Sequence, residues 1–213
     1  LCVSIIFWYI FEIYNRFIHG WHYVGLPESQ AITFAMGSIS FATIVPAVFE
    51  TWELVRQFHL FKPMIIRIEF KINKYLLYTS ILVGLLFLTL PFFYSKPFMW
   101  TFVWTGFVLL LDPVMFLLHN EKSLLWQIKK RKFNTVFSLF IAGYICGFFW
   151  EFWNYWQLTK WYYTVPILEN IKIFEIPVVG FLAYGPFAWE LYIMYQFVKL
   201  LFSKKFLGGV AGI

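Results

Sequence analysis

Long apolar stretches alternate with short polar ones along the chain. The apolar stretches cover residues 1–18, 31–55, 75–94, 97–118, 134–158 and 176–201. As a helix, each is long enough to cross the roughly 30 Å hydrocarbon core of a bilayer. The pattern therefore predicts an all-α membrane protein, built as a bundle of six transmembrane helices. Because the chain opens on Leu1 inside an apolar stretch, we expect further residues before it.

Composition supports the assignment to a membrane. The 213 residues are 61% hydrophobic and 13% charged, whereas a soluble domain carries about 25% charged residues. Aromatic residues make up 24%, which suits either belts at the membrane surface or the wall of a pocket for a long apolar ligand. The two cysteines show no metal-binding or disulfide spacing, and we expect no cofactor and no metal.

Basic residues set the expected orientation of the chain. They gather in the loops 56–74 and 119–133 and in the C-terminal tail, and they give the protein its net charge of +6. Because positively charged loops stay on the cytoplasmic side, these three regions should be cytoplasmic. We therefore interpret the positive charge of these regions as a signal of membrane topology, and we expect membrane lipid rather than nucleic acid as a partner.

One motif, Glu-x-x-Asn followed by Trp-x-Tyr, occurs twice in the chain. The first copy consists of Glu12, Asn15, Trp21 and Tyr23, and the second of Glu151, Asn154, Trp161 and Tyr163. The offset from Trp21 to Trp161 also aligns two later pairs, Pro46 with Pro186 and Glu50 with Glu190. Such a fixed offset indicates an internal duplication.

The duplication divides a single transmembrane domain, residues 1–213, into three parts. Repeat A covers residues 1–55, the central helices lie within 75–118, and repeat B covers 134–201. The first helix of repeat B is the fourth predicted span after the first helix of repeat A, so an even number of membrane crossings relates them. Both repeats should therefore share one orientation, which makes this a parallel duplication rather than an inverted one.

Several acidic residues lie inside the predicted spans, almost without basic partners. They are Glu12, Glu50, Glu53, Asp112, Glu151 and Glu190. A charged side chain at bilayer depth costs about 2.5–3.5 kcal/mol on insertion scales. We therefore expect these acids to face the bundle interior and some of them to be protonated. A buried protonated carboxylic acid can donate a proton, and the candidate catalytic donors are Glu50, Asp112, Glu151 and Glu190.

The two copies of the motif have a structural and a functional interpretation. Glu and Asn three residues apart share one helix face, where they could clamp two helices together or form the polar floor of a pocket. The Trp-x-Tyr pairs could belong to an interfacial belt or to the same pocket. On the second interpretation, the ligand-binding residues are Glu12, Asn15, Trp21, Tyr23, Asn154, Trp161 and Tyr163.

Three of the acids lie close to a proline. Glu50 and Glu190 each follow a proline by four residues, and Asp112 immediately precedes one. A proline frees a backbone carbonyl within a helix and kinks it. The three acids should reach a similar depth, either as a proton-sharing cluster or as separate hydrogen-bonding groups at kinks.

Two stretches near the second copy, WYYTVP at 161–166 and EIPVVGFL at 175–182, resemble the lycopene cyclase domain of carotenoid cyclases. That resemblance implies a small multi-helix membrane module that closes rings at the ends of a carotenoid by protonation. Glu151 matches the acid that precedes the family's loop, and the loop itself is matched by Trp161, Tyr163, Pro166 and Pro177.

The chain departs from that family at its acidic pair. Val179-Gly180 stands in its place, and the corresponding residues 36–39 of repeat A contain no acid either. The resemblance therefore implies a divergent member and not an ordinary lycopene cyclase. Residues 111–154 are also similar to uncharacterised bacterial polytopic membrane proteins, which implies no function.

Three functions remain open at this point. The chain could bind a carotenoid or other long isoprenoid between its repeats, and transform it as a cyclase-like or isomerase-like enzyme that uses a protonated carboxylic acid. It could instead be a non-catalytic integral subunit that binds other membrane subunits. It could also line a proton or solute pathway with its buried acids. In each case we expect a bacterial or archaeal cytoplasmic membrane.

Overall fold

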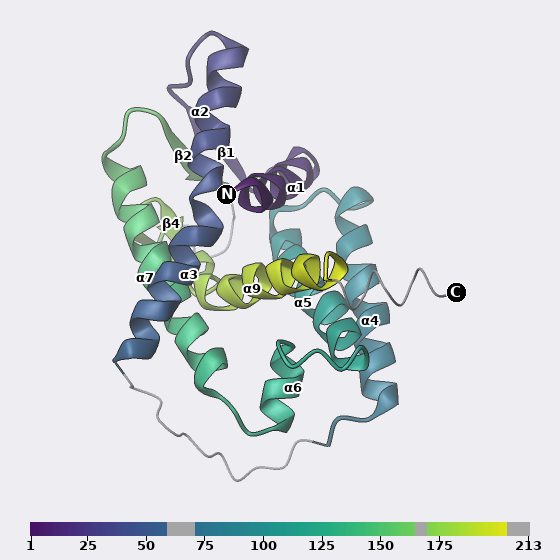
Figure 1. The fold of residues 1–213 in the computed structure, drawn as a ribbon. Coiled ribbons are helices and arrows are strands. Elements are labelled where there is room, and N and C mark those ends of the chain that lie inside the picture. Colours follow the sequence, from purple (N-terminus) through teal and green to yellow (C-terminus); the bar gives the residue numbers. More distant parts are fainter. Residues whose placement is uncertain (59–70, 165–169, 204–213) are drawn as a thin grey trace.

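The computed structural model describes residues 1–58, 71–164 and 170–203. It is mostly helical, with two short antiparallel ribbons (Figure 1). Residues 59–70 of the first basic loop, the tail from 204, and Pro166 lie outside the described residues. The helices of the first half are α1 (Cys2–Ile18), α2 (Gln30–Ala42), α3 (Ile44–Gln57) and α4 (Lys74–Thr89), followed by the 3-10 turns η1 (Leu90–Phe92) and η2 (Pro97–Met99).

The second half continues with α5 (Trp100–Leu117), α6 (Leu124–Lys129), α7 (Asn134–Trp156), α8 (Val178–Phe181) and α9 (Tyr184–Leu201). Its strands are β2 (Lys160–Tyr163), β3 (Lys172–Ile173) and β4 (Ile176–Pro177), while β1 (Trp21–Val24) belongs to the first half. Strand β1 pairs with β2, and β3 pairs with β4.

Four helical stretches are long and apolar enough to cross a membrane. They are Gln30–Gln57, Lys74–Phe92, Pro97–Leu117 and Asn134–Trp156, with mean hydropathies of 1.8, 1.9, 1.6 and 1.5. The prediction of helices long and apolar enough to span a membrane is thereby confirmed for the second to fifth apolar stretches. The prediction of six spans is not confirmed, because α1 and α9 are not among the four.

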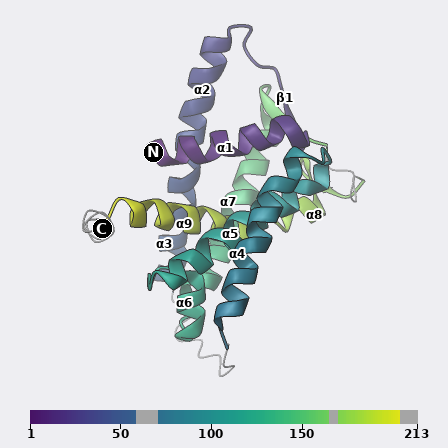
Figure 2. The same cartoon turned by 90° about the vertical axis from the view of Figure 1, so that its right-hand side faces the viewer.

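Helices α1 and α9 differ from three of the four candidate spans in direction as well. Figures 1 and 2 show α2, α3, α4 and α7 running along one common direction, whereas α1 and α9 lie across it. Both crossing helices are nevertheless well packed. Phe11 and Ile18 of α1 and Leu191 and Ile193 of α9 are each at most 1% exposed. The buried face of α1 packs against α2 and α3, and the buried face of α9 packs against α5 and α7.

The basic segments lie together at one end of the molecule. In Figure 1 the end of α3, the start of α4 and the whole of α6 lie at the bottom, and the ribbon β1–β2 lies at the opposite end. Arg56 belongs to the last turn of α3, Lys74 opens α4, and Lys129 ends α6. This agrees with the grouping of the two basic loops on one side, while their assignment to the cytoplasm stays a prediction.

A proline interrupts the helical path at matching places in the two halves. Pro46 is the third residue of α3, and Pro186 is the third residue of α9. Each lacks an N–H group, so the preceding turn loses a hydrogen bond. In the second half the Tyr144 hydroxyl donates to the freed carbonyl of Leu182 at 2.9 Å. In the first half the buried Ser4 hydroxyl accepts a hydrogen bond from the N–H of Val45, the residue before Pro46, at 3.0 Å.

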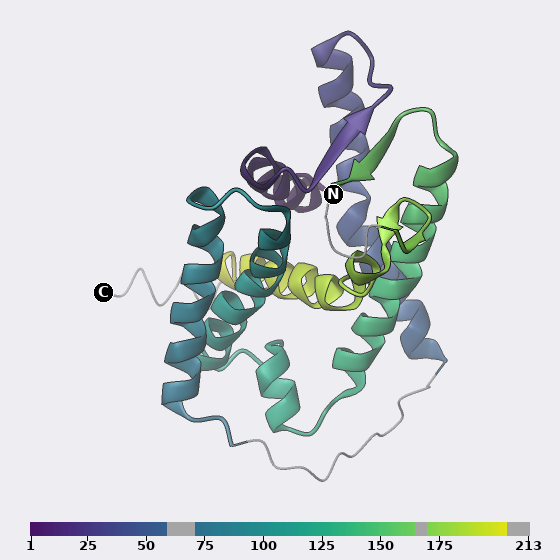
Figure 3. The same ribbon diagram turned by 180° about the vertical axis from the view of Figure 1, so that it is seen from behind.

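The ribbon β1–β2 joins two segments that lie far apart in the sequence (Figure 3). In its register Trp21 lies opposite Tyr163, Tyr23 opposite Trp161, and His22 opposite Tyr162. Side chains directly opposite one another in an antiparallel pair point to the same face. The ribbon therefore carries two Trp-x-Tyr pairs on one face and stacks His22 against Tyr162 on the other, with 5.8 Å between the ring centroids.

Candidate functional site

A cavity of about 1060 Å³ lies between the two halves of the chain. Its walls come from α1, α2, the ribbon β1–β2, the C-terminal end of α7 and the start of α9. Aromatic rings dominate the lining, which includes Trp8, Trp21, Tyr23, Phe41, Trp104, Trp150, Trp161, Tyr163, Tyr184 and Phe187. All four aromatic residues of the two Trp-x-Tyr pairs line it, whereas His22 and Tyr162 do not.

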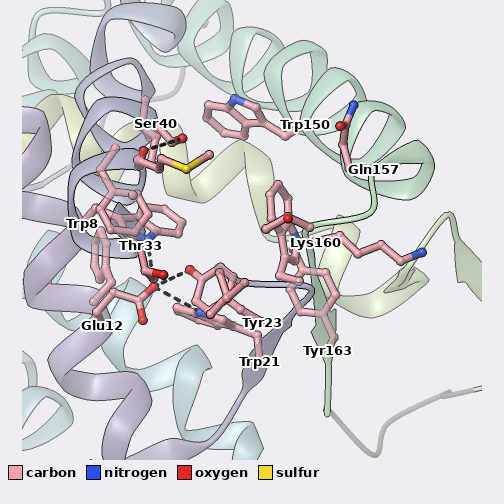
Figure 4. A pocket seen from close by; sticks show the side chains of 18 of the residues that line it. Trp8, Glu12, Trp21, Tyr23, Thr33, Ser40, Trp150, Gln157, Lys160 and Tyr163 are labelled. Carbon is pink, nitrogen blue, oxygen red and sulfur yellow. Dashed lines mark hydrogen bonds between the residues drawn. The ribbon is translucent and has the colours of Figure 1, made fainter. Parts of the chain in front are cut away.

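Glu12 brings a carboxylate to this cavity, held by three side-chain donors (Figure 4). Its Oε1 atom accepts from Trp8 Nε1 at 2.9 Å, from Trp21 Nε1 at 3.3 Å and from the Tyr23 hydroxyl at 2.6 Å. Burial and the neighbouring Glu12 carboxylate raise the pKa of the Tyr23 hydroxyl, so this hydroxyl keeps its proton and remains a donor. The cluster fixes one carboxylate oxygen within the aromatic wall.

Glu151 forms the corresponding cluster in the second half, but behind the cavity wall. Its Oε1 atom accepts from the hydroxyls of Tyr163 at 2.6 Å and Tyr184 at 2.5 Å. Trp161 Nε1 in turn donates to the Tyr163 hydroxyl at 2.9 Å. Burial, followed by the charges of Tyr184 and Glu151, raises the pKa of Tyr163 well above its usual value. Glu151 itself is fully buried and does not line the cavity, so it acts through the two tyrosines that do.

The two asparagines of the motif anchor the strands instead of lining the cavity. Asn154 donates from Nδ2 to the Trp161 carbonyl at 2.9 Å and accepts at Oδ1 from the Trp161 N–H at 2.9 Å. Asn15 donates to the Trp21 carbonyl at 2.9 Å and accepts from the Trp21 N–H at 3.2 Å. Each asparagine therefore positions the tryptophan of its own Trp-x-Tyr pair, and through it the ribbon face.

Glu50 and Glu53 contradict the expectation that the acids within the spans face the interior. Glu50 is exposed and contributes to a second, smaller cavity of about 210 Å³. The Glu53 side chain is 54% exposed and pairs with Arg56 at 2.7 Å. Helix α3 packs its buried positions Val45, Val48 and Val55 inwards, which turns both glutamates to the other side.

Asp112 is buried, and its role is visible in its hydrogen bonds. Its two carboxylate oxygens accept from the backbone N–H groups of Leu124 at 2.7 Å and Leu125 at 2.9 Å. These N–H groups open α6 and have no partners within that helix, so Asp112 caps it from a neighbouring element. The residue therefore connects α5 to the short basic helix.

Glu190 is fully buried on α9, and neither of its carboxylate oxygens has a hydrogen-bond partner in the described part of the chain. The proton-sharing cluster of Glu50, Asp112 and Glu190 is wrong, because Glu50 is exposed and both Asp112 oxygens bond to backbone N–H groups. Glu190 lies outside the large cavity.

Sequence reasoning missed Trp8 and Tyr184, which complete the two clusters. Trp8 precedes Glu12 by four residues, and side chains at that spacing share a helix face, so a helical projection could have found it. Tyr184 reaches Glu151 only because α9 crosses α7 closely. A Cβ atom on Gly143 of α7 would lie 2.1 Å from the Tyr184 carbonyl oxygen, so the two helices meet there without intervening side chains. No local signal in the sequence predicts that contact.

Two basic residues also reach the cavity lining. Lys160 donates to Glu175 at 2.6 Å and lies over the Tyr162 ring at 4.7 Å from its centroid. This hydrogen bond to Glu175 raises the pKa of the Lys160 amine and keeps it charged. Figure 4 shows its amino group pointing away from the Glu12 cluster. Arg16 follows Glu12 by one helical turn on the exposed end of α1.

The fold and the site define a helical protein with four candidate membrane spans and an aromatic cavity between the two halves of the chain. Comparisons with models of protein families, with curated proteins and with solved structures find no match to this chain. The expected relationship to the lycopene cyclase domain therefore stays a prediction that depends on the motif residues alone.

Proposed function

We propose that this protein binds a long apolar ligand of the isoprenoid class, such as a carotenoid, in the cavity between its two halves. The observation that carries the proposal is the cavity itself, about 1060 Å³ in volume and lined on several sides by tryptophan, tyrosine and phenylalanine rings. Sites for small molecules measure about 300–1,000 Å³ and are mostly apolar with a few placed polar groups. The Glu12 cluster supplies such a polar group here.

The internal duplication belongs to the same proposal and has support from the matched contacts. In both halves a glutamate accepts from the tyrosine of a Trp-x-Tyr pair, at 2.6 Å in each case. In both halves an asparagine bonds to the N–H and the carbonyl of the tryptophan of the Trp-x-Tyr pair. The ribbon register pairs each tryptophan with the tyrosine of the other copy, which is the pattern of a two-fold axis through His22 and Tyr162. On this proposal the ligand lies in the cavity, against the face of the ribbon that carries the two Trp-x-Tyr pairs.

Binding has more support than catalysis. None of the four candidate proton donors, Glu50, Asp112, Glu151 and Glu190, is among the residues that line the large cavity. Proton transfer requires the donor to lie within hydrogen-bond reach of the reacting atom. On the enzyme hypothesis the group in contact with the ligand would be Tyr163 or Tyr184, with Glu151 behind both hydroxyls. The proposal therefore makes ligand binding the primary activity.

The test is an analysis of the molecules that co-purify with the full chain in a mild detergent. An absorption spectrum and mass spectrometry of the organic extract should show an isoprenoid at about one molecule per protein. An extract that contains only bulk phospholipid would contradict the proposal. It would favour the alternative of a non-catalytic membrane subunit, which a pull-down from native membranes could then examine.

A further inference from the structure

The polar groups around Glu12 have more free hydrogen-bond acceptors than free donors. The N–H groups of Trp8 and Trp21 and the O–H group of Tyr23 each hold one proton, and all three protons point to Glu12 Oε1. The other carboxylate oxygen, Oε2, accepts no hydrogen bond from the described residues. Because Glu12 lines the cavity, lone pairs of a carboxylate oxygen remain available there to a ligand.

The tyrosines in front of Glu151 show the same imbalance. Tyr163 and Tyr184 both line the cavity, and both of their hydroxyl protons point to Glu151 Oε1. The Trp161 N–H is donated to the Tyr163 oxygen. What these hydroxyls can offer to a ligand is therefore their oxygen lone pairs, since a phenol carries a single proton. A ligand that satisfies either cluster has to bring its own donor.

The charges near the cavity favour a neutral donor over a cationic one. Arg16 lies one turn from Glu12 on the same helix, a spacing at which opposite charges attract. The Lys160 ammonium is already paired with Glu175 at 2.6 Å. Arg16 thus offsets the charge of the Glu12 carboxylate, which weakens its attraction for a cation. An ionised phosphate or carboxylate on the ligand has no proton to donate to Glu12 Oε2.

From these contacts we infer that the polar end of the ligand is a hydroxyl group, so that the cavity takes a long-chain isoprenoid alcohol. The hydroxyl donates to Glu12 Oε2, and the aromatic wall covers the hydrocarbon chain. The inference rests on the proposed isoprenoid cavity and adds the chemical class of the end group. It excludes isoprenoid phosphates as ligands. It also disfavours a plain hydrocarbon, which has no group that can donate a hydrogen bond to Glu12.

The experiment compares four probes that share one 20-carbon chain: geranylgeraniol, its methyl ether, its monophosphate and the corresponding primary amine. Each is titrated into the full-length protein in mild detergent, with quenching of tryptophan fluorescence as the readout. The wild-type protein should bind the alcohol about tenfold more tightly than the methyl ether, a difference of about 1.4 kcal/mol. It should also bind the alcohol more tightly than the phosphate and the amine.

The Glu12→Gln variant tests whether this residue sets the preference. Three donors converge on Glu12 Oε1, so they should hold the glutamine oxygen there and leave its NH₂ group at the place of Oε2. A donor then replaces the free acceptor, and the preference for the alcohol over the ether should fall from about tenfold to about onefold. Glu53→Gln is the matched control, because this exposed glutamate pairs with Arg56 outside the cavity.

The outcomes separate the end group from the cavity. If the wild-type protein binds alcohol and ether equally, or prefers the phosphate or the amine, the hydroxyl assignment is overturned and the isoprenoid cavity stands. If none of the four probes binds, both proposals fail. The wild-type comparison requires no substitution, so it decides the question even where Glu12→Gln does not fold.

Discussion

Replacing Asn154 with alanine should loosen the ribbon β1–β2 and lower the stability of the protein. The side chain is 2% exposed and makes two hydrogen bonds of 2.9 Å to the N–H and carbonyl groups of Trp161. A typical intramolecular hydrogen bond contributes about 1 kcal/mol net, so the substitution should cost about 2 kcal/mol. For a protein of this size that loss corresponds to a fall in Tm of roughly 4–8 °C.

Thermal unfolding in detergent, followed by tryptophan fluorescence, would measure the change. Asn15→Ala removes the corresponding contacts to Trp21 and should cost a similar amount. Because both asparagines hold strands of one ribbon, the double variant should lose less than the sum of the single losses. Asn134→Ala is a suitable control, since the buried Asn134 Oδ1 has no hydrogen-bond partner in the described part of the chain.

Two results would refute this reasoning about the ribbon. A Tm for Asn154→Ala equal to that of the wild-type protein would show that the two hydrogen bonds do not hold the strand in place. Strict additivity in the double variant would show that the two strands do not act as one unit. Either result would also remove the support that the matched contacts give to the duplication.

Three further predictions concern groups away from the ribbon. Glu190→Leu should raise the Tm, because it replaces a buried carboxyl without hydrogen-bond partners by an apolar side chain; an unchanged or lower Tm would reveal a partner for that acid. Asp112→Ala should cost about 1 kcal/mol through the lost cap of α6, measurable as a lower Tm, and Asp112→Asn should cost less. The Lys160–Glu175 pair raises the pKa of the Lys160 amine, so its stabilising effect should be complete below about pH 10.4 and be lost as the pH rises through the higher folded value. A Tm difference between the wild-type protein and Lys160→Met that persists unchanged at still higher pH would contradict this.

The sequence predicted the four candidate spans because the hydropathy signal is local. An apolar run of about 20 residues reads as a span without knowledge of its neighbours. The same local signal also predicted spans at α1 and α9, which are not among the four candidate spans and which lie across α2, α3, α4 and α7. Hydropathy alone does not distinguish a helix covered by lipid from one covered by protein.

The motif predicted which residues gather at the site but not what each of them does. Glu12 and the two Trp-x-Tyr pairs line the cavity, whereas Asn15 and Asn154 hold the strands. Pairing of Trp21 with Tyr163 depends on a contact between distant segments, which no sequence window contains. For the same reason the exposure of Glu50 could not be read from the chain, since the packing of α3 decides it.

The most direct test of the central claim is to fill the cavity and count the bound ligand. Gly37 lines it, and an added Cβ atom would meet only the Phe41 ring at 3.7 Å, so Gly37→Phe should fold and place a ring in the ligand's space. Ala35→Phe adds the same ring at an exposed position that is not part of the lining. Mass spectrometry of the extracts should find about one isoprenoid per protein in the wild type and in Ala35→Phe, and far less in Gly37→Phe. Equal amounts in all three, with Gly37→Phe folded, would contradict the account.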